Sequence, residues 1–297
     1  MKNYISIDIG GTAIKYGVID QTGAIVTKNQ MKTEAFQGGK SILNKVFDII
    51  EQYKDTYAPV GLCISTAGMV DIKKGRIIHA SHTIPEYTGM EIKKCVEETF
   101  SIACEVENDV NCAGLAEYVS GSAKGSAVAL CLTVGTDIGG CAIIDGKVFH
   151  GASNSACEVG YMQLLNGNFG ILGASSTLIK NVAKQKSDDV ENWDGIKIFS
   201  QAKKGDAICI KAIEDMVDIL GRGIANICYV LNPDVVVLGG GIMAQKQYLK
   251  EKIDAALDQY LITAIRKHTK IVFAAHGNDA GMIGAYYHFC QIHDING

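Results

Sequence analysis

The chain has 297 residues, 47% of them hydrophobic and 20% charged, with a formal net charge of −4. This length allows two domains of ordinary size, and the composition is that of a globular protein rather than a disordered one. The slightly acidic charge predicts no extended surface for nucleic acid, and no window reaches the roughly 18 uninterrupted apolar residues of a membrane span.

The start of the chain and its cysteines predict a cytoplasmic protein. The opening stretch MKNYISIDIGGT reaches Asp8 too soon to contain the apolar core of a signal peptide. None of the ten cysteines lies in a CxxC pair, and most lie in apolar runs such as VALCLTV. Buried free thiols in a reducing compartment are therefore expected.

The first half of the chain has the pattern of a mixed α/β domain. Its first 30 residues alternate apolar and polar in three runs separated by GT and QTG, which predicts a three-stranded antiparallel meander. A helix near 39–54, a strand at PVGLCIS, a helix near 90–100, a strand at ACEVEN and a helix from about Asp109 to Val119 follow. The order is βββαβαβα.

The second half repeats this order. SAVALCLTV, GGCAIID and GKVFHG form a second predicted meander, and helices follow from about 174 to 231. The strand DVVVLGG, a helix near 245–260, the strand KIVFAA and a closing helix from Asp279 complete the copy. The sequence therefore predicts two duplicated α/β domains around a central cleft, at 1–119 and 120–297, with the closing helix at about 279–292 packed on the first.

The glycines of DIGGTAIK lie between two predicted strands. A Walker loop and a dinucleotide fingerprint are excluded, since both require a helix after the glycines. A hairpin remains, in which Gly10, Gly11 and Thr12 would offer N–H groups and a hydroxyl to a phosphate, and Lys15 a positive charge. Taken alone, this stretch favours a plain β-turn.

The second meander carries the matching stretch TVGTDIGG, which makes coincidence a poorer explanation for the first. Two such hairpins could hold the phosphates of a nucleotide from both sides; the second would use Gly135, Thr136, Gly139 and Gly140.

A third glycine run, VVVLGGG, ends a buried strand, which is where α/β sheets bind ligands. Gly239, Gly240 and Gly241 would let an adenine ring and its ribose lie against the backbone.

Five motifs together resemble a known family: DIGGTAIK, ENDVNCAGLAE, LTVGTDIGG, CEVG and NPDVVVLGGG. They are similar to the phosphate, sugar, catalytic and adenosine motifs of the ROK sugar kinases and repressors, in the actin and hexokinase superfold. The resemblance runs through nearly the whole chain in the right order. It implies a cytoplasmic, homodimeric sugar kinase with two actin-like, ribonuclease H-like domains that uses ATP and Mg²⁺ and closes over its substrates.

The stretch VENDVN ends a strand and opens a helix. Asn and Asp favour helix caps, which is the structural alternative here. A sugar kinase, however, needs a carboxylate that accepts the proton of the attacking hydroxyl. The resemblance implies that Asp109 is this base and that Asn108 binds sugar hydroxyls. Asp8 would hold the waters of the ATP-bound Mg²⁺, or else stabilise its own turn.

Further sugar contacts follow from the resemblance. Thr66 and Gly68 in STAGMVD correspond to a loop that approaches the sugar, with Ala67 in place of the usual proline. Thr83 in SHTIPEYTG stands where members often have an asparagine. Tyr87 either stacks on a sugar face or packs against the protein.

The stretch CEVGYMQLLNGNFG departs from the family pattern. Glu158 corresponds to the sugar-binding glutamate, but Tyr161 replaces the zinc-binding histidine of many members, and the loop has no cysteine or histidine. No structural zinc is therefore expected. The shorter loop implies a wider pocket at the anomeric end of the sugar, with Tyr161 as a candidate contact. We expect phosphorylation of the 6-hydroxyl of a hexose or hexoside, above all a β-glucoside such as cellobiose, with glucokinase and N-acetylmannosamine kinase as alternatives.

Two other classes compete with a kinase. A repressor of this family carries an N-terminal helix-turn-helix, whereas the first predicted strand begins at about residue 3. A non-catalytic sugar or nucleotide sensor, or an actin-like scaffold, would not need the retained Asp109 and the three glycine sites.

Overall fold

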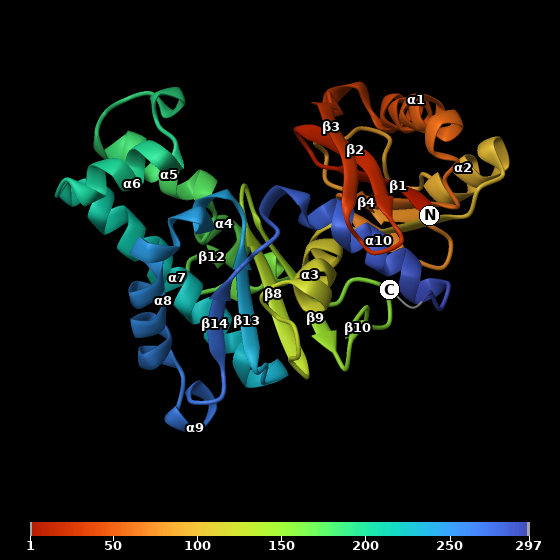
Figure 1. Cartoon of the computed structure of the whole chain (residues 1–297). Helices are drawn as coiled ribbons and strands as arrows, with labels where there is room; N and C mark the ends of the chain where they lie inside the picture. Colours follow the sequence, from red (N-terminus) through yellow and green to blue (C-terminus); the bar gives the residue numbers. More distant parts are fainter. Residues whose placement is uncertain (1, 296–297) are drawn as a thin grey trace. The chain divides into compact units, whose positions relative to one another are not determined.

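The computed structural model describes residues 2–295, which form two compact units. The first unit contains the residues up to Val119, Val148–Ala156 and the residues from Asn278 onward. The second contains Ser120–Lys147 and Cys157–Gly277. Each has a five-stranded sheet with an equivalent strand order (Figure 1), which confirms the predicted duplicated α/β fold.

The sheet of the first unit has the order β3-β2-β1-β4-β7. Antiparallel pairs join β1 to β2 and β2 to β3, and β4 and β7 run parallel to β1, as the sequence predicted. The strands are β1 (Asn3–Ile9), β2 (Ala13–Asp20), β3 (Ile25–Lys32), β4 (Gly61–Thr66) and β7 (Cys104–Asn108).

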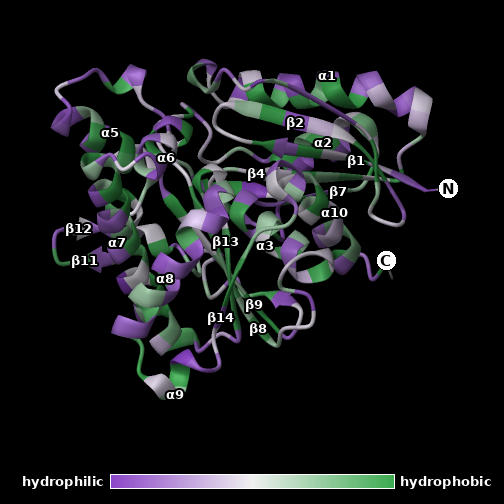
Figure 2. Ribbon diagram, turned by 60° about the vertical axis from the view of Figure 1, so that its left-hand side comes forward, coloured by the Kyte–Doolittle hydropathy of each residue, from purple (hydrophilic) through white to green (hydrophobic). Residues whose placement is uncertain are grey.

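Helices cover both faces of this sheet. Successive side chains of β1 point to opposite faces, and both sets are buried against helices. Ile5, Ile7 and Ile9 belong to a core that includes α1, while Tyr4 lies edge-on to Tyr286 of α10 at a ring-centroid distance of 5.1 Å. Hydrophobic and hydrophilic residues alternate along α1 (Figure 2). The helices are η1 (Ala35–Gln37), α1 (Gly39–Tyr57), α2 (Ile92–Phe100), α3 (Asp109–Ser120) and α10 (Ala280–Ile292).

A small hairpin of β5 (Met69–Asp71) and β6 (Arg76–His79) follows β4. This hairpin was not predicted, because strands of three and four residues are too short to show a clear alternation.

The sheet of the second unit has the order β10-β9-β8-β13-β14. The predicted strand GKVFHG pairs only over two residues, because the chain joins the first unit from Val148. The strands are β8 (Val128–Val134), β9 (Ile138–Ile144), β10 (Lys147–Val148), β13 (Val235–Gly239) and β14 (Lys270–Phe273). A separate hairpin joins β11 (Gln163–Leu164) and β12 (Gly167–Asn168).

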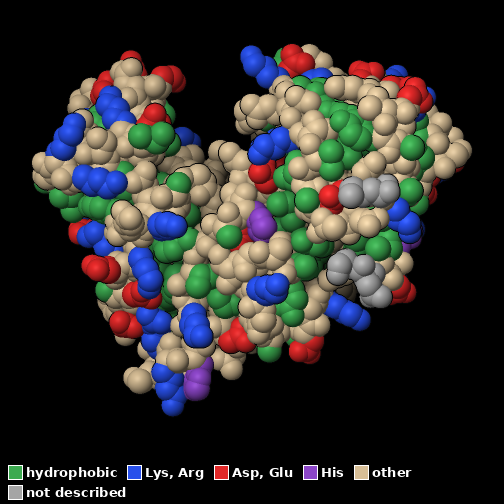
Figure 3. Space-filling view, in the orientation of Figure 1, with side chains coloured by type: hydrophobic (Ala, Val, Ile, Leu, Met, Phe, Trp, Pro, Cys, Tyr) green, Lys and Arg blue, Asp and Glu red, His purple; other side chains and the backbone are tan. Residues whose placement is uncertain are grey.

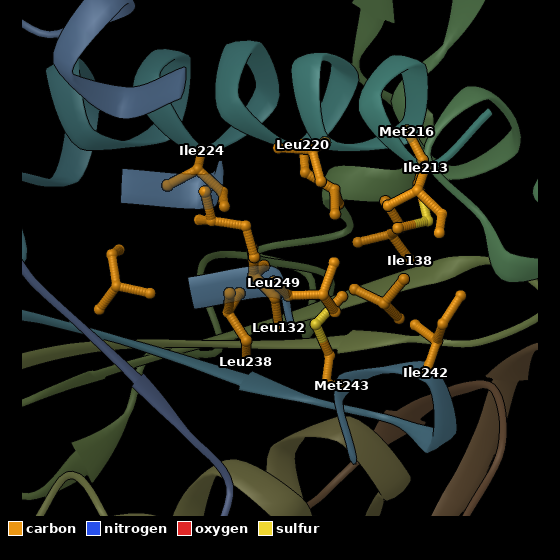
Figure 4. Packing of buried hydrophobic residues seen from close by; sticks show 14 of the residues in the cluster. Leu132, Ile138, Ile213, Met216, Leu220, Ile224, Leu238, Ile242, Met243 and Leu249 are labelled. Carbon is orange, nitrogen blue, oxygen red and sulfur yellow. The ribbon is translucent and has the colours of Figure 1, made fainter. Parts of the chain in front are cut away.

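The long helix α7 covers this second sheet. Its residues Ile213, Met216, Leu220 and Ile224, spaced three or four apart, point toward the sheet (Figure 4), where Leu132 and Leu238 lie. Burial of each such side chain contributes about 1.5–3 kcal/mol. The helices are η2 (Val159–Tyr161), α4 (Phe169–Leu172), α5 (Ser175–Gln185), η3 (Val190–Asn192), α6 (Gly195–Lys203), α7 (Ala207–Leu231), η4 (Gly241–Gln245), α8 (Lys246–Tyr260), α9 (Thr263–Arg266) and η5 (Gly277–Asp279).

The surface carries charges of both signs. Lys and Arg side chains are interspersed with Asp and Glu on each unit in the face that Figure 3 shows. Within residues 2–295, no helix is both long and apolar enough to cross a membrane.

Candidate active site

Three polar side chains form a row across the parallel strands of the first unit. Asp8 on β1 pairs in register with Ser65 on β4, and Ser65 pairs with Glu107 on β7. All three are buried, and each lies at the second-last position of its strand. The next row is Ile9, Thr66 and Asn108. The predicted residues therefore lie at the carboxyl edge of the sheet, where α/β proteins bind ligands.

The Asp8 carboxylate is held from two sides. Its Oδ1 accepts a hydrogen bond of 2.7 Å from the Ser65 hydroxyl, and its Oδ2 lies 3.5 Å from the Lys15 ammonium group. Only 8% of Asp8 is exposed. Ser65 was not predicted as a site residue, although its place in the parallel register could have revealed it.

The β1–β2 turn is held at its base and open at its tip. Gly10 donates its N–H to the Ala13 carbonyl at 3.1 Å and accepts the Thr33 hydroxyl at 2.6 Å. Gly11 and Thr12 are exposed, and a side-chain carbon on Gly11 would meet nothing within 4 Å. This turn therefore presents free space beside backbone N–H groups, as an anion site requires.

A cavity of about 450 Å³ lies beside Lys15 in the same unit. Its walls include Lys28, which forms an ion pair of 2.8 Å with Asp279. The remaining lining residues are Asn29, Gln30, Asn278 and Met282.

Asn108 and Asp109 join β7 to α3. The Asn108 side-chain oxygen accepts the N–H groups of Val110 and Asn111 at 2.9 and 3.0 Å, so it caps the helix. Its amide nitrogen donates to the Gly68 carbonyl at 2.9 Å and to Asp109 Oδ1 at 3.1 Å. The capping alternative and the predicted sugar contact thus concern the same residue, and Asn108 brings Gly68 and Asp109 together.

Thr66 and Gly68, at the end of β4 and in the loop after it, have different surroundings. Gly68 has φ +100°, and a side-chain carbon there would come within 2.8 Å of the His79 carbonyl oxygen, so only glycine fits. The Thr66 side chain is fully buried and its hydroxyl lies 2.6 Å from that of Tyr87. Thr66 therefore supports Tyr87 and has no surface left for a direct sugar contact through its hydroxyl.

Tyr87 is also fully buried, so its ring has no free face for a sugar, and packing is its role. Burial raises the pKa of its hydroxyl, the Thr66 hydrogen bond opposing this. Thr83 is exposed, and its hydroxyl lies 2.6 Å from that of Ser81.

Glu107 is the buried acid that the sequence analysis did not assign. Its Oε1 accepts the Asn108 N–H at 2.7 Å and the Asn111 amide at 3.0 Å, and its Oε2 accepts His150 Nε2 at 2.6 Å. Burial would raise the pKa of Glu107, but the His150 hydrogen bond and the nearby His288 hold it below its usual value. Glu107 is therefore a buried hydrogen-bond acceptor at the start of α3, two residues before the predicted base.

The second glycine hairpin lies at the start of a helix in the second unit. The Gly135 carbonyl accepts the N–H and the hydroxyl of Ser175 at 2.9 and 2.7 Å, and the Thr136 carbonyl accepts the Ser176 hydroxyl at 3.0 Å. Both serines belong to the first turn of α5. A helix N-terminus next to this hairpin favours an anion there.

The third glycine run contacts this hairpin within the second unit. Gly240 has φ +99°, and a side chain on it would overlap the Val134 backbone directly before Gly135. Gly239 is buried, whereas a side-chain carbon on Gly241 would meet nothing within 4 Å.

Glu158 directly precedes the short helix η2, and Tyr161 is its last residue. Glu158 is partly buried and its carbonyl accepts the Tyr161 N–H at 3.2 Å, while the Tyr161 side chain is 59% exposed. Gly140 brings the hairpin to this loop, since a side-chain carbon on it would come within 2.7 Å of the Cys157 carbonyl oxygen. Gly139 pairs with Thr133 in the β8–β9 ladder. Within residues 2–295, no three His, Cys, Asp or Glu side chains are grouped to hold a metal ion.

Known proteins resemble the chain over nearly its full length. An uncharacterized protein of Clostridium perfringens is 50% identical over 95% of this chain and 96% of its own. A glucokinase of Halalkalibacterium halodurans (95% and 93% of the chains) and a β-glucoside kinase of Listeria monocytogenes (96% and 97%) are each 28% identical.

Solved structures share the fold as well. A ROK family protein of Streptococcus pneumoniae, solved in complex with sucrose, superposes with a TM-score of 0.85 at 27% identity and covers 98% of this chain and 99% of its own. The model of the ROK family matches residues 4–292. With the two repeated sheets and the glycine and acidic motifs in place, this chain belongs to the ROK family.

Proposed function

We propose that the chain is an ATP-dependent sugar kinase that phosphorylates the 6-hydroxyl of a hexose or hexoside. The observation that carries this proposal is the Asn108–Asp109 pair at the carboxyl end of β7, one strand position beyond the buried Asp8–Ser65–Glu107 row. A carboxylate held beside a hydrogen-bonding amide suits a base that deprotonates a sugar hydroxyl. The ROK membership and the kinases among the relatives support it.

Each proposed role follows from a local environment. Asn108 holds one oxygen of Asp109 at 3.1 Å and fixes the direction of the carboxylate, which takes the proton of the attacking hydroxyl. The Gly10–Thr12 turn and Lys15 bind phosphate oxygens in the first unit. In the second unit, the Gly135–Gly140 hairpin with α5 binds phosphate, Gly239–Gly241 binds adenosine, and Glu158 binds the sugar.

The donor set of Asp8 fits an ATP-bound Mg²⁺. A single carboxylate at a phosphate turn suits this ion, which retains most of its waters and is held mainly by phosphates. Bound Mg²⁺ would neutralise charge that develops on the transferred phosphoryl group. Asp8 would accept hydrogen bonds from its waters while Ser65 and Lys15 keep the carboxylate in place.

The favoured substrate is a β-glucoside such as cellobiose. The loop after Glu158 contains the helix η2 and the short β11–β12 hairpin and carries an exposed Tyr161 in place of a zinc ligand. We propose that no zinc module narrows the pocket and that Tyr161 contacts the second sugar ring. The β-glucoside kinase relative and the relative bound to sucrose, also a disaccharide, support this choice. Glucose and N-acetylmannosamine are the alternatives.

ADP release measured with ATP and Mg²⁺ over a sugar panel tests both levels of the proposal. The expected order of kcat/KM places cellobiose and a methyl β-glucoside above glucose and N-acetylmannosamine, with the phosphate found on the 6-oxygen. Faster turnover of glucose or N-acetylmannosamine would refute the glycoside assignment and leave the kinase intact. No sugar-dependent ADP release with any member would refute the kinase and favour a sensor. We also propose that the protein is cytoplasmic, forms a homodimer and contains no zinc. Sedimentation of the purified protein checks the dimer, and elemental analysis checks the zinc content.

A further inference from the structure

A buried hydrogen-bonded cluster ties a separate piece of chain to the start of α3, the helix that carries the proposed base. Glu107 is 1% exposed and lies between Asn111 of α3, His288 of α10 and His150. His150 belongs to Val148–Ala156, which is part of the first unit although the chain on both sides of it belongs to the second. The Glu107–His150 bond therefore joins segments 43 residues apart.

The segment Val148–Ala156 has little else to hold it by burial. Most of its side chains are exposed or half-buried, whereas the His150 ring reaches inward and is 20% exposed. The backbone around it turns back on itself, since the Ala156 N–H donates to the His150 carbonyl at 3.2 Å. Gly151 and Asn154 have positive φ values of 68° and 55°, so the loop shape depends on local constraints.

His150 and Ala156 thus define a closed loop, and Glu158 follows two residues after it. The conformation at the exit is unusual as well, because Cys157 has φ 62°. His150 anchors one end of this loop to Glu107. The anchor therefore restricts the position of the other end, Ala156, from which the backbone continues to Glu158. The same Glu107 carboxylate binds Asn111 in the first turn of α3, next to Asp109.

We infer that His150 is a positioning residue: its hydrogen bond to Glu107 fixes Val148–Ala156 and thereby the backbone from which Glu158 projects. This inference rests on the proposed function for the role of Glu158 and adds a residue that acts through others. If His150 only stabilised the fold, its replacement would lower the melting temperature without a specific change in the KM for sugar.

The structure offers a matched control, a second histidine bonded to a glutamate of β7. His293 Nε2 lies 3.0 Å from Oε1 of Glu105, which is two residues before Glu107 on β7. His150→Phe and His293→Phe each remove one histidine–glutamate hydrogen bond from the first unit and keep a planar ring. His150→Gln retains an N–H donor at a comparable reach.

Hydrogen exchange and steady-state kinetics of the full chain test the inference together. His150→Phe should speed exchange across residues 150–158 by about tenfold or more and raise the KM for sugar by a similar factor, with the KM for ATP unchanged. His150→Gln should restore most of both, and His293→Phe should change neither even if it lowers the melting temperature.

Unchanged exchange in His150→Phe would overturn the inference, as would faster exchange with an unchanged KM for sugar. If the wild-type chain phosphorylates no sugar, the proposed kinase fails. The exchange of residues 150–158 then still decides whether His150 fixes the loop.

Discussion

The Asp8 carboxylate lies directly against the α-carbon of Gly281, in the first turn of α10. A side-chain carbon on Gly281 would overlap both oxygens and the carboxyl carbon of Asp8. The helix therefore forms one wall of the proposed magnesium site, and only glycine leaves the carboxylate in its observed place.

Gly281→Ala should reduce turnover more than stability. The added methyl pushes Asp8 away from Ser65 and Lys15, which should lower kcat by roughly 100-fold and raise the Mg²⁺ concentration needed for half-maximal rate. Kinetics as a function of Mg²⁺ and a melting curve measure this. Wild-type Mg²⁺ dependence in a folded variant would show that Asp8 has no part in binding the ion.

Asp109→Asn should leave the fold intact and remove the base. Because general bases contribute about 10²–10⁴-fold, we expect a loss of kcat in this range with little change in the KM for sugar. Asp48→Asn, the same change on the exposed face of α1, is the control and should behave as wild type. Equal rates for Asp109→Asn and wild type would assign the base elsewhere.

Gly284→Ala should destabilise the first unit. A side chain on Gly284 would overlap the backbone carbonyl of Cys112, which cannot move without shifting α3. We expect a loss of about 1–3 kcal/mol in the free energy of unfolding, measured with urea. Gly195→Ala, at the start of α6, meets only a contact of 3.8 Å from Ile242 and should be nearly neutral. Equal stabilities of the two variants would contradict this close packing.

The free energy of unfolding should decrease as the pH is lowered through a window set by His288. Burial lowers the pKa of His288, although Glu107 opposes this, so below about pH 6.5 the unfolded chain binds a proton that the folded chain resists. The melting temperature should therefore drop between about pH 7.5 and 5.5. Glu107, whose pKa is also held low, adds a further loss only at more acidic pH, as it becomes protonated in the unfolded chain.

His288→Gln should flatten the first part of this profile, while His268→Gln, an exposed histidine of the second unit, should not. Thermal melts over this pH range give the slopes. Parallel profiles for wild type and His288→Gln would rule out His288 as the source.

Periodicity predicted both meanders and the order of the main helices because these segments bury one or two complete faces. The β5–β6 hairpin and the short β10 were missed, since their few residues depend on tertiary neighbours. Glu107 was missed for another reason. An acid alternating with Val106 on a strand normally indicates a solvated face, but β7 is buried on both faces, and Glu105 and Glu107 are matched there by Lys93 and His150.

Motifs singled out Asp8, Asn108 and Asp109 as candidates because their spacing from the strand ends is local. No local pattern could locate Gly281 or His150, since each meets its partner only after distant segments pack. Thr66 shows the reverse case, in which a motif position proves buried against Tyr87.

The packing of α10 has a consequence for how the protein is made. Tyr4, Cys63 and Cys112 bury their side chains against Met282, Tyr286 and Phe289 of this helix. While the ribosome is still translating the second unit, the face of the first sheet that α10 will cover stays exposed. The amino-terminal unit therefore completes its core only after α10 emerges, and chaperones that bind apolar nascent chains should protect it until then.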